Sequence, residues 1–203
     1  MIILLLGGIG SGKTLSVIKK IIDNPESFAV TNFSLKIEKE RYCRLKMEDL
    51  ICKRMEDKKN IQSVNWKFWD EMRKKHEHFS VYLDEVHNLI HSRASMSKRN
   101  ILMSKWISQI RKILSDSPHN HLYIISQTIR KVDVDFRELA QIIIECRKRV
   151  YKGKTYIVQK YYTGIDEYFM RQHYCRMAFA ADMYFKYYDT NEMVTFADAD
   201  VYV

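Results

Sequence analysis

Short unbroken apolar runs alternate along the chain with longer segments in which apolar residues recur every three or four positions. The first pattern is typical of buried β-strands, and the second is typical of helices with one apolar face. The patterns predict strands at 2–6, 28–33, 80–85, 121–127 and 141–146 and helices at 13–23, 41–57, 64–78, 97–115 and 133–140. Because strands and helices alternate, we expect an α/β fold with a mostly parallel central sheet that helices flank on both faces.

The C-terminal quarter of the chain has a different pattern. The sequence YKGKTYIVQKYY at 151–162 predicts a β-hairpin, in which a basic strand end and a Lys-Gly-Lys turn lead into a returning strand. Residues 164–203 show no clear period. We therefore expect a core domain at 1–150 and a small C-terminal extension of β and irregular structure at 151–203 that packs on it.

A cluster of glycines follows the first predicted strand. The chain has six glycines, and four of them stand between positions 7 and 12. Glycine loses more backbone entropy on folding than other residues, so such a cluster indicates close approach of the backbone to a ligand. The spacing Gly7-x-x-x-x-Gly12-Lys13-Thr14 is the P-loop pattern, and it stands between a predicted strand and a predicted helix, as a P-loop does. A chance glycine-rich turn is the alternative. A GxGxxG dinucleotide site is a weaker one, because its register does not match and it leaves Lys13 and Thr14 unexplained.

The P-loop interpretation assigns a role to each part of this segment. Backbone N–H groups and the helix N-terminus bind phosphate oxygens, Lys13 reaches the β- and γ-phosphates, and the Thr14 hydroxyl is a ligand of Mg²⁺. The expected ligands are therefore ATP and Mg²⁺. The predicted nucleotide-binding residues are Gly7, Gly8, Ile9, Gly10, Ser11, Gly12, Lys13, Thr14 and Leu15.

Two adjacent carboxylates end the predicted strand at 80–85. Ligands bind at the carboxyl ends of strands in an open α/β sheet, so Asp84 is expected to hold Mg²⁺ through water, opposite Thr14. Glu85 is expected to polarise the attacking water as a general base. An acidic start of the following helix is the alternative, and both can hold together.

A glutamate directly after the aspartate is typical of the additional-strand-catalytic-glutamate (ASCE) branch of P-loop enzymes. In that branch another strand lies between the P-loop strand and the acidic strand, and HLYIISQ at 121–127 is the candidate. Gln127 at its end would then lie beside the γ-phosphate as a sensor and contribute to catalysis. A polar residue at a strand exit is the alternative.

The composition of the chain adds expectations about its binding partners, its location and its metal binding. The net charge is +9 and the isoelectric point is about 9.3, which fits an anionic partner such as nucleic acid. No apolar run approaches the roughly 20 residues of a membrane span, so we expect a cytoplasmic protein. No CxxC pair or HExxH motif occurs, so reduced thiols and no metal site are expected among Cys43, Cys52, Cys146, Cys175, His76, His78, His87 and His91.

Several motifs together resemble the zonular occludens toxin-like ATPases of the FtsK–HerA superfamily of DNA-pumping motors. They are GGIGSGKT, TNFSLK with Asn32, VYLDEVHNLI, and WISQIRKI followed by HLYIISQTIRKVDVDFRELA. The likeness covers roughly residues 1–150, and MYFKYYDTNEMV near the C-terminus is similar to the F-x-x-Y-x-T tail of such proteins. The resemblance implies a RecA-like core that assembles into a ring, which we expect to be a hexamer.

The transition state needs charge neutralisation beyond Lys13 and Mg²⁺, and an arginine finger can supply it. Arg111 is the first choice, with Arg130 and Arg137 as alternatives. An arginine on the helix at 97–115 is expected to reach a neighbour's nucleotide rather than its own. A surface basic residue remains the alternative for each.

The leading functional hypothesis is an ATP-driven motor that threads double-stranded DNA and packages a viral genome, docked on a capsid or a membrane partner. It would work in the host cytoplasm, with virion association as a further expectation. A filamentous virion extrusion ATPase is one alternative, although such members carry a membrane helix and an extracytoplasmic domain that this sequence lacks. A small-molecule kinase and a non-enzymatic ATP-binding scaffold are the others.

Overall fold

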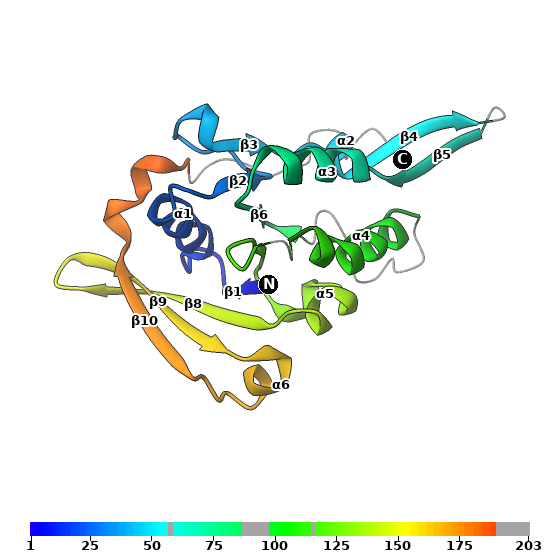
Figure 1. Ribbon diagram of the computed structural model, residues 1–203. Helices are drawn as coiled ribbons and strands as arrows, with labels where there is room; N and C mark the ends of the chain where they lie inside the picture. The colour runs from blue at the N-terminus through cyan, green and yellow to red at the C-terminus, as the bar shows by residue number, and fades with distance from the viewer. Residues whose placement is uncertain (57–58, 87–97, 115–116, 190–203) are drawn as a thin grey trace.

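The computed structural model describes residues 1–56, 59–86, 98–114 and 117–189 (Figure 1). The strands are β1 Ile2–Leu6, β2 Phe28–Thr31, β3 Tyr42–Arg44, β4 Ile51–Glu56, β5 Lys59–Val64, β6 Phe79–Leu83, β7 Leu122–Ser126, β8 Ile142–Tyr151, β9 Lys154–Tyr162 and β10 Cys175–Ala180. The α-helices are α1 Lys13–Asp23, α2 Met47–Leu50, α3 Trp66–Lys75, α4 Lys98–Leu114, α5 Val134–Glu138 and α6 Gly164–Phe169. Short 3₁₀ turns are η1 Lys39–Arg41, η3 Ile129–Lys131, η4 Ala181–Met183 and η5 Phe185–Tyr187.

Eight strands form one sheet in the order β10-β9-β8-β1-β7-β6-β2-β3. The pairs from β8 to β3 are parallel, whereas β8–β9 and β9–β10 are antiparallel. The expected mostly parallel sheet is therefore confirmed. Strand β7 lies between the P-loop strand β1 and the acidic strand β6, as the ASCE pattern predicts.

The central strands β1, β6 and β7 are buried on both faces of the sheet, and β1 shows how one apolar run contributes to both. Ile2, Leu4 and Leu6 of β1 pack into a core beneath α3, α4 and α5. Ile3 and Leu5 point the other way, into a core beneath α1 and the C-terminal segment. Figure 1 shows these helices on opposite sides of the sheet. An alternating direction of side chains explains why this strand is apolar at every position.

The predicted helix at 41–57 is wrong. This segment forms β3, one turn of α2, and β4, which pairs with β5 as a separate antiparallel ribbon. Its composition favours a helix, but hydrogen bonds from β3 to the core strand β2 and from β4 to β5 outweigh that local preference. The shorter predicted helix at 64–78 is confirmed as α3, with Asn65 as its N-cap.

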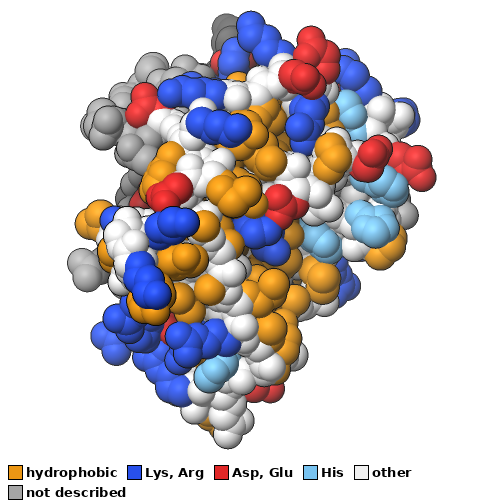
Figure 2. Space-filling model, turned by 90° about the vertical axis from the view of Figure 1, so that its left-hand side faces the viewer, with side chains coloured by type: hydrophobic (Ala, Val, Ile, Leu, Met, Phe, Trp, Pro, Cys, Tyr) orange, Lys and Arg blue, Asp and Glu red, His pale blue; other side chains and the backbone are white. Residues whose placement is uncertain are grey.

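The predicted hairpin is confirmed, and it extends the main sheet. Strands β8 and β9 pair along their length, and their turn is made by Lys152 and Gly153. Figure 2 looks onto the side of the molecule that carries this turn, and lysine and arginine side chains are spread over that side. No helix within the described ranges is long and apolar enough to cross a membrane.

The C-terminal segment leaves β10 and crosses back over α1. Tyr184 donates from its hydroxyl to Asp23 Oδ1 at 3.2 Å, at the end of α1. The Lys36 amide donates to the Tyr187 carbonyl at 2.9 Å, which ties η5 to the loop after β2. These contacts hold the segment after β10 beside α1 (Figure 1).

Candidate nucleotide-binding site

The turn between β1 and α1 has the backbone of a phosphate-binding loop. Helix α1 begins at Lys13, and its N-cap Gly12 has φ 88°, a left-handed conformation that favours glycine. No side chain caps this end of α1. The first N–H groups of a helix have no acceptor inside the helix, so here they remain available to an anion.

Two polar side chains are buried inside this loop. Lys13 is only 6% exposed, and its Nζ donates to the Gly8 carbonyl at 3.1 Å, so the side chain folds back across the loop. Ser11 Oγ is buried and has no hydrogen-bond partner among the described residues. A buried polar group without a partner is costly, so the Ser11 hydroxyl fits a site that is completed by phosphate oxygens. The Lys13 ammonium lies in the same loop and supplies a positive charge for them.

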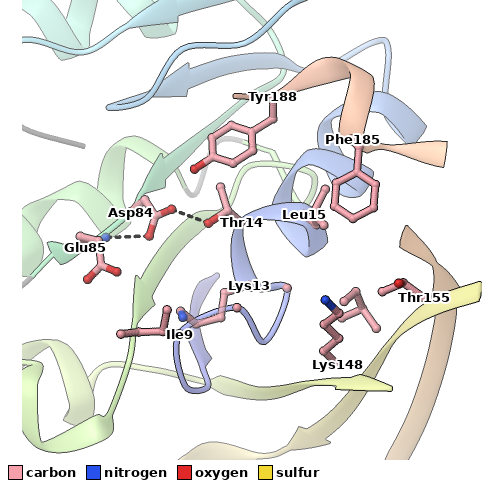
Figure 3. Close-up of a pocket in the computed structure, with 13 residues that line it drawn as sticks. Ile9, Lys13, Thr14, Leu15, Asp84, Glu85, Lys148, Thr155, Phe185 and Tyr188 are labelled. Carbon is pink, nitrogen blue, oxygen red and sulfur yellow. Dashed lines mark hydrogen bonds between the residues drawn. The ribbon is translucent and has the colours of Figure 1, made fainter. Parts of the chain in front are cut away.

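The structure brings Thr14 and Asp84 together across 70 positions of sequence. Thr14 Oγ1 donates to Asp84 Oδ2 at 2.6 Å (Figure 3). The other carboxylate oxygen, Oδ1, accepts from the Glu85 amide at 2.8 Å. A hydroxyl and a carboxylate are hard oxygen ligands of the kind that Mg²⁺ takes, so this pair fits the predicted metal position. The described residues contain no cluster of three or more His, Cys, Asp or Glu that could hold a metal.

Asn32 fixes the backbone of Asp84. It is 1% exposed, and its side chain both donates to the Asp84 carbonyl at 2.8 Å and accepts from the Asp84 amide at 2.7 Å. Strand β2, which ends one residue earlier, lies beside β6 in the sheet. The Asn32 side chain therefore takes the place of the next pair of backbone hydrogen bonds between β2 and β6. It thereby fixes the position of the Asp84 backbone, from which the carboxylate extends.

Burial changes the proton affinity of Asp84. The side chain is 4% exposed, and burial raises its pKa to about 6, with a further rise from the Glu85 carboxylate. The hydrogen bond from Thr14 acts in the opposite direction. A cation placed here would stabilise the ionised form, because an opposite charge lowers the pKa of a carboxyl group.

Glu85 and Gln127 meet at the ends of β6 and β7. Gln127 Nε2 donates to Glu85 Oε1 at 3.4 Å, and Lys131 Nζ donates to Gln127 Oε1 at 3.0 Å. Glu85 has φ 48°, a conformation that is uncommon for residues other than glycine and that concentrates at functional sites. Lys131 is a part of this chain of contacts that the sequence did not single out.

A pocket of about 400 Å³ opens over the P-loop. Besides P-loop residues and the acid pair, its lining includes residues of the β8–β9 hairpin and of the C-terminal segment (Figure 3). These residues are Lys148, Thr155, Ile157, Phe185 and Tyr188. The sequence offered one signal for them: Phe185 and Tyr188 are the aromatic positions of the F-x-x-Y-x-T motif.

The comparisons with known proteins establish the fold. The N-terminal domain of zonular occludens toxin from Neisseria meningitidis has a TM-score of 0.59 and 17% sequence identity, over 93% of this chain and 98% of that chain. The chain has the fold of a zonular occludens toxin-like P-loop NTPase. The expected RecA-like fold class is thereby confirmed. No protein-family model matches the sequence, and no curated protein matches it.

Two other solved structures are similar with lower scores. The genome packaging NTPase B204 from Sulfolobus turreted icosahedral virus 2, in complex with ATP-gammaS, has a TM-score of 0.46 and 14% identity, over 81% of this chain and 97% of that chain. A KaiC-like protein from Pyrococcus horikoshii has a TM-score of 0.46 and 11% identity, over 81% of this chain and 80% of that chain.

The predicted arginines lie apart from the pocket of this P-loop NTPase fold. Arg111 on α4 and Arg130 in η3 are exposed, Arg137 on α5 is half-buried, and none of the three lines the pocket. Among the described residues, none of these three arginines is therefore brought to the site within one chain. His87 and His91 lie outside the described residues.

Proposed function

We propose that the protein hydrolyses ATP and uses the energy to translocate double-stranded DNA, in the packaging of a viral genome. The observation that carries the hydrolytic part of this proposal is the 2.6 Å contact between Thr14 of the P-loop and Asp84, with Glu85 directly beside it. This contact joins the two halves of a nucleotide-hydrolysing site in one pocket. The fold shared with the toxin domain supports the same class of protein.

The binding half of the site acts through positive groups. The N-terminal N–H groups of α1 and the Lys13 ammonium would bind the phosphates, with Lys13 exchanging the Gly8 carbonyl for a phosphate oxygen. Thr14 and Asp84 would hold Mg²⁺, which neutralises charge on the β- and γ-phosphates when bound. Asn32 keeps the Asp84 backbone in place for that role.

The hydrolytic half acts through Glu85. Its carboxylate accepts a proton from a water molecule, and the water oxygen forms a bond to the γ-phosphorus. The bond from that phosphorus to the oxygen shared with the β-phosphate breaks, and the electron pair leaves with ADP. Gln127 donates to Glu85, and through this contact it would sense whether the γ-phosphate is present.

The positions of the arginines support an assembly in which copies of the chain complete each other's sites. Arg111 is exposed on α4 and lies away from its own pocket. A finger from a neighbouring copy would supply the missing positive charge, as in other P-loop enzymes whose arginine acts in trans. We propose a ring, with a hexamer as its expected form.

The end of the β8–β9 hairpin supports DNA as the partner. Five basic residues and no acidic residue occur in 147–154, and all five are exposed. Tyr151 at the tip is 63% exposed. Lysine and arginine bind the DNA backbone by displacing its counterions, and this attraction is independent of base sequence, as a translocating motor requires.

Two variants test the proposal. Lys13→Ala should lose nucleotide binding, whereas Glu85→Gln should bind ATP but hydrolyse it roughly 10²- to 10⁴-fold more slowly. Phosphate release is measured with and without double-stranded DNA, and DNA is expected to stimulate the wild-type rate. Hydrolysis that DNA leaves unchanged in the assembled protein would contradict a motor. Phosphate transferred to a nucleoside monophosphate, instead of released, would identify a kinase.

A further inference from the structure

We propose that the half of the pocket that faces the β8–β9 hairpin and η5 is the subsite for the nucleobase, with Phe185 as its stacking platform. The inference rests on the proposed function, because it requires that the P-loop bind the phosphates of a nucleotide. It adds the residues that would recognise the base and thereby set which nucleotide is used.

The hairpin forms one wall of this subsite. Lys148 and Ile157 are paired across β8 and β9, so their side chains project from the same face. Ile157 is buried against the P-loop: a Cβ atom added to Gly12 would lie 2.2 Å from Ile157 Cδ1. Thr155 lies two residues before Ile157 on the same face, and both Thr155 and Lys148 line the pocket. The wall is therefore an apolar patch with two polar groups at its edge.

The C-terminal segment forms the opposite wall, and its other aromatic residues are already engaged. Tyr184 packs edge-on against Phe179 at 5.6 Å, and Tyr188 packs edge-on against Phe33 at 6.1 Å. Phe185 stacks on no aromatic ring within the described part of the chain, is 40% exposed, and lines the pocket. An exposed aromatic ring on a well-anchored turn is a favourable surface for a flat ligand.

The two ends of the pocket differ in the same way as the two ends of a nucleoside triphosphate. Figure 3 shows Asp84 and Glu85 at one end, and Phe185 with Thr155 and Lys148 at the other, with the P-loop between them. A triphosphate that runs along the loop with its γ-phosphate toward the acid pair would place its base beside Phe185. The volume of about 400 Å³ is within the range of small-ligand sites.

The chemistry of the lining matches a nucleobase. A base ring can stack on the Phe185 face, and Leu15 and Ile157 offer apolar contact. The Thr155 hydroxyl can donate or accept, and the Lys148 ammonium can donate, toward nitrogen and oxygen atoms at the edge of the base. Stacking of a base on an aromatic side chain is worth about 1–3 kcal/mol by alanine substitution, which converts to a change of roughly 5- to 100-fold in affinity.

The test compares a nucleotide with a phosphate chain that lacks a base. Dissociation constants for ADP and for inorganic tripolyphosphate, each with Mg²⁺, are measured by calorimetry on wild type, Phe185→Ala and Phe185→Tyr. Phe185→Ala should bind ADP roughly 5- to 100-fold more weakly and tripolyphosphate as wild type does, and Phe185→Tyr should restore ADP binding. Phe169→Ala removes another exposed phenylalanine, on α6, and is the matched control.

The outcomes separate this inference from the proposed function. Unchanged ADP affinity in Phe185→Ala, or an equal loss for ADP and tripolyphosphate, would overturn the base subsite even if ATP hydrolysis is normal. A wild-type protein that binds ADP through Phe185 but releases no phosphate from ATP would contradict the proposed function and leave the base subsite standing.

Discussion

At the scale of single residues, the site depends on side chains that would never touch a nucleotide. Asn32 is the main example, because its two hydrogen bonds hold the backbone of Asp84 beside Thr14. The sequence placed Asn32 within a motif but gave no reason for it. Its role follows from the pairing of β2 with β6, a contact between segments about 50 residues apart. Gln127 was predicted from its place after a strand, and the structure adds its contact with Glu85.

Replacing Asn32 should damage both stability and hydrolysis. Asn32→Ala leaves the buried N–H and C=O groups of Asp84 without partners, which costs about 1–3 kcal/mol each. Thermal unfolding should show a lower melting temperature, and phosphate release should fall because the carboxylate is no longer held opposite Thr14. Asn65→Ala is the control: the Asn65 side chain also bonds to two backbone groups, the Glu48 carbonyl and the Phe68 amide, and its loss should lower stability alone. Normal hydrolysis per folded molecule in Asn32→Ala would contradict a positioning role.

At the scale of elements, the local sequence pattern was sufficient to predict the strands that are buried on both faces of the sheet. Strands β1, β6 and β7 and helix α1 were predicted closely because a continuous apolar run or a helical period leaves few alternatives. The segment 41–57 was predicted wrongly, because its residues favour a helix in isolation and become strands only through partners elsewhere in the chain. The hairpin was predicted, but its packing against Gly12 was not, since nothing in a local pattern reports a contact 145 positions away.

The hairpin should be separable from the catalytic groups. Arg149→Glu combined with Lys152→Glu reverses two exposed charges near its tip and should weaken DNA binding and flatten its dependence on salt, since fewer counterions are released. ATP hydrolysis without DNA should change little. Lys74→Glu with Lys75→Glu, on the exposed end of α3, makes the same change of charge elsewhere. Equal effects of the two pairs on DNA affinity, measured across a salt series, would mean that the hairpin is not a specific contact.

At the scale of the whole molecule, the pocket is assembled from four separate parts of the chain: the P-loop, the end of β6, the hairpin and η5. The sequence predicted residues of the first two, because each carries a compact motif. It did not predict Lys148 or Thr155, because their place in the pocket depends on how β8 and β9 extend the sheet beyond β1. The fold class was therefore easier to predict than the full lining of the site.

The stability of the whole chain should fall in mild acid through His121. Burial, together with the Met1 amino group and Lys20, lowers the pKa of His121 to about 4. Its neutral form thus contributes stability that is present above about pH 6.5 and is lost as the pH falls toward 4. Asp84 acts in the opposite direction, because its pKa is raised in the folded state.

A comparison of variants isolates the contribution of His121 to the pH dependence of stability. The melting temperature should decrease less between pH 7 and pH 5 in His121→Asn than in wild type, while the exposed His173→Asn should follow wild type. An identical pH dependence for His121→Asn and wild type would rule out this contribution.

All three tryptophans, Trp66, Trp69 and Trp106, pack on the face of the sheet that α3 and α4 cover. The α1 helix and the C-terminal segment, which supply much of the pocket, cover the other face. Tryptophan fluorescence therefore reports from the face of the sheet opposite α1 and the C-terminal segment. If nucleotide shifts the unfolding curve that tryptophan fluorescence records, the two faces of the sheet unfold cooperatively. The size of the shift measures this coupling without an added label.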